Sequence, residues 1–291
     1  MQTEIPRVHV LFAVLAATLA LAWPAPTSAA PRAQASKSIS YAQKTFQLDR
    51  PDQKERFTVG CRGNTYPLGG GMISSPTPGA EGEGVYPHSY ERLGVQRGFH
   101  VTATLFDPTP RSTQSRSVTL QVACRKDHRH VTPPHRTTYL SPGQTKTVVA
   151  TCPGRRHLFS GGFQRTDFIS TGGDFVTASY AISSKSWAVT GHAFGSFGGE
   201  LTAIAYCWRS KGPLLTPVSA STSVSPGSFG TATTPPCAKG HLISGGFASS
   251  PADTGFFTNG MFNPDGSWSA SLYNQFGPAA TLAAYGYCVK G

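Results

Sequence analysis

Beyond position 40, hydrophobic and polar residues alternate in short runs that Gly and Pro interrupt. The runs 118–124, 201–207 and 282–288 read VTLQVAC, LTAIAYC and LAAYGYC, and each ends in cysteine. No window keeps apolar residues at the i, i+3, i+4, i+7 spacing of an amphipathic helix. Short apolar or alternating runs bounded by Gly and Pro are typical of β-strands joined by turns. The pattern predicts an all-β protein.

The first thirty residues have the pattern of a signal peptide. Arg7 precedes an apolar run over 10–23, and small residues follow to position 30. The run is shorter than the roughly 20 residues that span a bilayer. We therefore expect a signal peptide over 1–30, a flexible segment over 31–40, no transmembrane segment, and a secreted, extracellular or cell-wall-associated protein.

The rest of the chain repeats one unit three times, which we place at 41–126, 127–211 and 212–291. Each copy contains a cysteine, a nearby glycine, a short apolar stretch, adjacent glycines and a large apolar residue. These last two features read Gly69-Gly70-Gly71-Met72, Gly161-Gly162-Phe163 and Gly245-Gly246-Phe247. Pro51-Asp52, Pro142-Gly143 and Pro226-Gly227 precede the first cysteines and predict a lead-in hairpin in each copy.

Six cysteines in an exported chain are expected to pair, and repetition predicts the same bond in each copy. The expected disulfides are Cys61–Cys124, Cys152–Cys207 and Cys237–Cys288, each stabilising the fold by about 3–4 kcal/mol through chain entropy. The alternative is a cross-copy set, Cys124–Cys152, Cys207–Cys237 and Cys61–Cys288. No CxxC spacing suggests a metal or redox role.

These residues resemble a repeat of secreted actinobacterial proteins of unassigned function. The matching residues are Cys152-Pro153-Gly154, Gly161-Gly162-Phe163, Ser179-Tyr180, Trp187 and Tyr206-Cys207. A looser similarity is to vitelline membrane outer layer protein, a β-prism of three cysteine-bounded repeats. The resemblance implies three antiparallel β units in a prism-like, pseudo-threefold arrangement and a monomer that is a covalent pseudo-trimer. Three tandem small β-sandwiches are the alternative fold.

The chain is strongly basic, with a formal net charge of +11. Basic residues are concentrated in the segments 32–56 and 125–151, so the excess is expected in a lead-in and a connector and not on one folded face. A positive exported protein suits a glycan or an anionic cell-envelope polymer as partner. Nucleic acid is not expected, because the basic residues do not interleave with aromatic residues in a known module.

Four aromatic residues are candidate ligand contacts, Trp187, Trp268, Tyr90 and Tyr180, because exposed aromatic rings stack on sugars. Repeated large apolar residues on strands more often form the core, which is the alternative for both tryptophans. Metal binding by His128, His130 and His135 is not expected beside so many basic residues, and the sequence implies no cofactor.

We expect a non-enzymatic β-repeat protein that binds a glycan, a cell-envelope polymer or a protein through equivalent sites on its three copies. One alternative is an extracellular glycan hydrolase that uses Glu81, Glu83 or Glu91 of the first copy. The other is a purely structural exoprotein.

Overall fold

The computed structural model describes residues 39–48, 54–75, 84–93, 98–106, 116–126, 133–165, 172–208, 213–275 and 277–290. The expected signal peptide lies outside these residues, as do Pro51-Asp52, His128, His130, Glu81 and Glu83. The described chain is all-β without helices, as the sequence predicts, and it forms three six-stranded antiparallel sheets. β1 begins at Ile39, two residues before the expected start of the first repeat.

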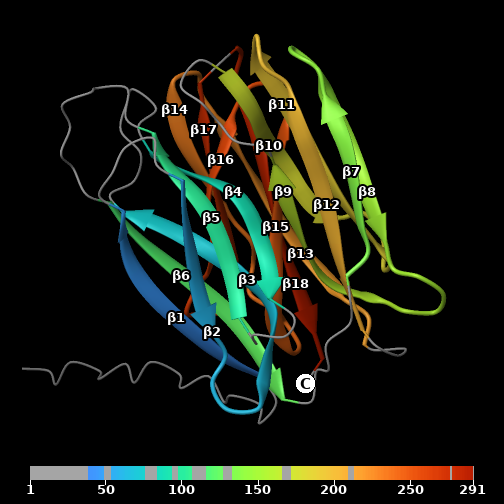
Figure 1. The fold of residues 1–291 in the computed structure, drawn as a ribbon. Helices are drawn as coiled ribbons and strands as arrows, with labels where there is room; N and C mark the ends of the chain where they lie inside the picture. The colour runs from blue at the N-terminus through green and yellow to red at the C-terminus, as the bar shows by residue number, and fades with distance from the viewer. Residues whose placement is uncertain are drawn as a thin grey trace, which may run out of the picture. The chain divides into compact units, whose positions relative to one another are not determined.

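Each sheet combines three strands from one third of the chain with three from another (Figure 1). Sheet A has the order β1 (Ile39–Leu48), β6 (Arg116–Lys126), β3 (Thr65–Ser75), β16 (Phe256–Phe262), β17 (Trp268–Asn274) and β14 (Ser228–Thr233). Sheet B has the order β2 (Lys54–Gly60), β5 (Gly98–Phe106), β4 (Gly84–Leu93), β9 (Leu158–Arg165), β12 (Gly199–Cys207) and β7 (His135–Leu140). Sheet C has the order β13 (Thr216–Val224), β18 (Ala280–Val289), β15 (His241–Ser250), β10 (Gly172–Ala181), β11 (Ser186–Gly195) and β8 (Thr145–Thr151).

The repeats are therefore joined in a ring by strand pairing. β4 of the first repeat pairs with β9 of the second, β10 of the second with β15 of the third, and β16 of the third with β3 of the first. One continuous cluster of buried side chains runs through all three repeats. Three tandem sandwiches, the alternative from the sequence, would each keep their strands to themselves and are not what forms.

The Pro-Gly dipeptides make turns, but the predicted lead-in hairpin is wrong. Gly143 and Gly227 have φ values of 72° and 66°, and the amide of Gln144 donates to the carbonyl of Ser141 across the first of these turns. The strands on either side do not pair with each other, because β7 belongs to sheet B and β8 to sheet C. These turns move the chain from one sheet to the next.

The disulfides follow the within-repeat pattern that repetition predicts: Cys61–Cys124, Cys152–Cys207 and Cys237–Cys288. Each one joins two different sheets. Cys61 directly follows β2 of sheet B, for example, whereas Cys124 lies in β6 of sheet A. Three such bonds are typical of proteins in an oxidising, extracellular environment.

The adjacent glycines let the strands approach closely. A Cβ on Gly70, Gly161 or Gly245 would collide with an aromatic ring of the same repeat, respectively Phe99, Trp187 and Trp268. A Cβ on Gly71, Gly162 or Gly246 would collide with a backbone carbonyl oxygen of the neighbouring repeat, respectively Gly260, Tyr90 and Ser179. One glycine of each pair thus admits the core ring, and the other admits the next repeat.

Buried polar groups connect the same neighbours. The Tyr206 hydroxyl accepts a hydrogen bond from the Arg92 amide at 2.7 Å, and the Tyr287 hydroxyl accepts one from the Ala181 amide at 2.7 Å. In the first repeat Gln121 takes the place of the tyrosine, since its Oε1 accepts a hydrogen bond from the Phe262 amide at 2.9 Å. The tyrosine near the last cysteine therefore links one repeat to the preceding one.

Candidate functional site

Three of the four candidate ligand aromatics lie in the core. Trp187, Trp268 and Tyr90 are 1%, 2% and 7% exposed. Trp187 and Trp268 cover glycines, and Tyr90 stacks on Phe163 with ring centroids 5.3 Å apart. Their burial leaves no ring face for a sugar, so the ligand-contact prediction for these three is corrected to a packing role. The cavity beside them is about 20 Å³, room for about one water molecule.

Tyr180 is the candidate aromatic that reaches the surface. It is half-buried at the end of β10, and it stacks on Tyr285 of β18 with centroids 5.1 Å apart and an interplanar angle of 15°. Because the two rings face each other, much of the face of Tyr180 is already covered. Tyr180 therefore stays a candidate contact, but it is not the centre of the candidate site.

The acidic residues of the first repeat give little support to a hydrolase. Glu91, the one of the three inside the described residues, lies 3.0 Å from Nε2 of the buried His100. Burial raises the pKa of Glu91, but hydrogen bonds from His100 and Gln164 outweigh it and leave the pKa below its ordinary value. The carboxylate thus faces a histidine and not a second carboxylate. Within the described ranges no group of three His, Cys, Asp or Glu side chains could hold a metal ion.

Basic residues collect at one end of the sheets, which corrects the expectation that the charge avoids a folded face. This basic end is the end that carries the three disulfides. Its lysines and arginines in the described chain are Arg62, Arg92, Arg125, Lys126, Arg155, Arg156, Lys185, Lys239 and Lys290. Glu91 and Asp265 are the acidic residues described there. The antiparallel strands bring these positions together, because the corresponding turns of the three repeats lie at the same end of the sheets.

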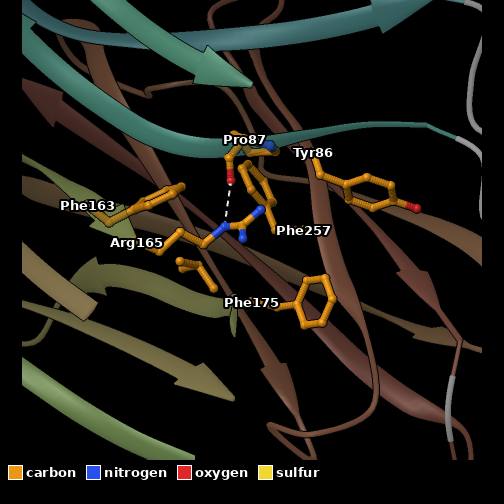
Figure 2. Close-up of a pocket in the computed structure, with 7 residues that line it drawn as sticks. Tyr86, Pro87, Phe163, Arg165, Phe175 and Phe257 are labelled. Atoms are coloured by element: carbon orange, nitrogen blue, oxygen red, sulfur yellow. Dashed lines mark hydrogen bonds between the residues drawn. The ribbon is translucent and has the colours of Figure 1, made fainter. Parts of the chain in front are cut away.

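The opposite end is close to electrically balanced among the residues described. Lys54, Arg116, Lys146 and Arg165 lie there with Glu55, Asp174, Glu200 and Asp253. Arg165 is also fully buried, and Figure 2 shows its guanidinium between aromatic rings, with Nε donating to the Pro87 carbonyl at 3.1 Å. Its Nη1 donates to the Asp174 carbonyl at 2.6 Å and lies 4.0 Å from the Asp174 carboxylate. This buried arginine is paired within the fold.

Arg92, the buried arginine of the basic end, is in a different position. It is 8% exposed at the end of β4, and its guanidinium carbon lies 5.4 Å from the centre of the Phe159 ring. Its Nε and Nη2 atoms are buried without a hydrogen-bond partner in the described structure. Nε and Nη2 form one edge of the guanidinium plane, the fork that binds two oxygens of an oxyanion. Both hydrogen-bond donors of that edge are therefore unsatisfied.

A second guanidinium stands on the same aromatic pair. Phe159 packs on Trp208 with ring centroids 4.9 Å apart, and the guanidinium carbon of Arg125 lies 5.4 Å from the centre of Trp208. Burial lowers the pKa of Arg92, because removing a charge from water disfavours the charged form. Glu91, next to Arg92 in sequence, is turned to the other face of β4 and bonded to His100. The carboxylate nearest in sequence therefore does not neutralise Arg92.

Comparison of the three repeats shows that the fold does not require an arginine here. Arg92 pairs with Phe99, as Ala181 pairs with Trp187 and Phe262 with Trp268. The equivalent positions thus hold alanine and phenylalanine. Arg92 was not among the residues predicted from the sequence, although aligning the repeats through their aromatic residues would have marked it as the one charged residue at this position.

No protein-family model matches the chain, and a search of characterised proteins finds no match. The described residues contain no helix that could cross a membrane. The assignment of a function therefore rests on the charge distribution and on Arg92.

Proposed function

We propose that the protein is a secreted, non-enzymatic module whose basic end binds an anionic polymer of the cell envelope. The observation that supports this proposal is the contrast between the two ends: nine lysines and arginines against two acidic residues at the basic end, and equal numbers at the opposite end. A surface of one sign attracts a polyanion and speeds its association.

The repeats suit a polymeric ligand. Arg62, Arg155 and Lys239 each follow the first cysteine of their repeat within three residues, and all three are exposed. Equivalent charges on three copies offer weak contacts that add through effective concentration. We also infer that the three sheets with their shared core form the prism-like, pseudo-threefold fold that the resemblance implies, which would place these charges around one axis.

Removing one basic residue beside each disulfide tests the function. The triple variant R62Q/R155Q/K239Q should bind purified cell walls at least about tenfold more weakly than the natural sequence, and binding by the natural sequence should weaken as salt rises. The matched control is K44Q/K54Q/R56Q, which removes the same charge from exposed positions on β1 and β2. Co-sedimentation with cell walls measures both.

Equal loss in the two triple variants would show that only net charge matters and would contradict a role for the basic end. If the folded protein does not bind cell walls at any salt concentration, the proposal fails and a structural role is left.

A further inference from the structure

We propose that Arg92 is a binding site for a phosphate group, which the Nε–Nη2 edge of its guanidinium would hold through two hydrogen bonds. This inference deepens the proposed function, on which its biological meaning rests, by naming the charged group of the polymer that the basic end recognises. The binding site itself depends on the geometry of Arg92 and of the aromatic and basic side chains around it.

The first step is the free-energy cost of burying the Nε–Nη2 edge of Arg92 without hydrogen-bond partners. Buried polar groups in folded proteins are nearly always hydrogen-bonded, and a buried unpaired charge costs much more than a neutral group. The contact with Phe159 compensates part of this cost, since a cation over a ring is attracted to it, but a ring satisfies neither N–H donor in the guanidinium plane. An oxyanion would satisfy both donors and the charge at once.

The second step compares the two buried arginines. Arg165 has carbonyl partners at 3.1 Å and 2.6 Å and a carboxylate at 4.0 Å. Arg92 is nearly as buried, yet two of its nitrogens have no hydrogen-bond partner. The same fold thus pairs one buried arginine internally and leaves two buried nitrogens of the other without a hydrogen-bond partner.

The third step concerns the class of anion. Arg125 lies over Trp208, and Trp208 packs on the Phe159 ring that Arg92 faces, so a second positive group belongs to the same aromatic cluster. Two positive groups favour phosphate, with several acceptor oxygens and up to two negative charges, over a singly charged carboxylate. Arginine binds the two oxygens side by side, which lysine cannot do.

The test is binding of inorganic phosphate to the full chain. It is measured by calorimetric titration and by the rise of the unfolding midpoint with phosphate concentration. We expect saturable binding by the natural sequence and at least about tenfold weaker binding by R92K, which keeps the charge and loses the fork. R92A should fold, because Ala181 occupies the equivalent position, and should lose saturable binding. R56Q, exposed on β2 and outside the basic end, is the matched control and should bind phosphate as the natural sequence does.

Unchanged phosphate binding in R92K and R92A would overturn the inference, and so would an absence of saturable binding by the natural sequence. Polymer binding separates the two proposals. If cell-wall binding needs Arg62, Arg155 and Lys239 but phosphate does not need Arg92, only this inference fails. If phosphate binds at Arg92 and cell walls do not bind, only the proposed function fails. Stronger binding of acetate than of phosphate would assign the edge to a carboxylate and contradict the choice of anion.

Discussion

At the scale of single residues, the structure separates side chains that look alike in the sequence. Tyr206 and Tyr287 precede the last cysteine of their repeats, and each accepts a backbone hydrogen bond from the neighbouring repeat. Burial raises the pKa of both hydroxyls, so they stay protonated over the ordinary pH range. Tyr139, by contrast, is 58% exposed.

Removing one of these hydroxyls should destabilise the protein. Y287F leaves the Ala181 amide without its acceptor, and an unsatisfied buried donor costs about 1–3 kcal/mol in the free energy of unfolding. Y139F is the control and should change that free energy by less than about 0.5 kcal/mol. Denaturant unfolding of the three proteins measures the difference, and equal stabilities would show that the hydroxyl contributes nothing.

Prediction from sequence succeeds for these residues where repetition carries the information. Matched cysteines indicate the disulfides, and the repeated placement of the tryptophans supports the core alternative over the ligand contact. Arg92 could not be found this way, because whether a guanidinium edge has a partner depends on the carbonyls and carboxylates that other strands bring to it. The same limit applies to Tyr90, which is buried through its contacts with Phe163 and Phe257 on strands far away in sequence.

At the scale of strands, the local signals predicted turns and strands but not their partners. A Pro-Gly dipeptide sets the backbone of a turn and leaves open whether the next strand pairs with the previous one. Here the strands around Pro142-Gly143 join different sheets, so the expected hairpin does not form. The Gly-Gly pairs allow close approach of strands. The structure adds that the second glycine of each pair faces the neighbouring repeat.

That contact makes the second glycine a sensitive position. In G162A the new methyl group would meet the Tyr90 carbonyl oxygen, which is backbone and has little room to move. We expect a loss of at least about 1–3 kcal/mol, the usual cost of overpacking, or failure to fold.

G60A is the matched control for this substitution. Gly60 ends β2, and a Cβ added there has no atom within 4 Å. The stability of the G60A protein should therefore stay close to that of the natural sequence. Thermal unfolding followed by circular dichroism compares the two. A G162A protein as stable as G60A would contradict the close packing of β9 on β4.

At the scale of the whole molecule, the described repeats cannot be treated as separate domains. Every repeat supplies three strands to each of two sheets, and each disulfide joins two sheets. The sequence revealed three copies but could not show this exchange, since a strand carries no label for the sheet it joins. Within each repeat the strand order along the chain is the same, which is why the basic segments meet at one end.

Shared sheets predict a single unfolding transition. With disulfides intact, calorimetry should show one peak, and tryptophan fluorescence and circular dichroism should give the same midpoint. The physical reason is that unfolding one repeat removes half of two sheets and opens the common core to water. Two or three resolved peaks would mean that the repeats unfold independently.

The exchange of strands also means that no repeat is intrinsically first or last. β1 and β18 both have their outer ends on the disulfide side, where the Tyr41 hydroxyl donates to the carbonyl of Leu242, the residue that pairs with Cys288. A short linker there, with the chain opened between β6 and β7, would give a circular permutant that keeps every strand pair. Such permutants would let each repeat in turn take the chain termini, so that a tag or a surface anchor could be attached beside any of the three disulfides.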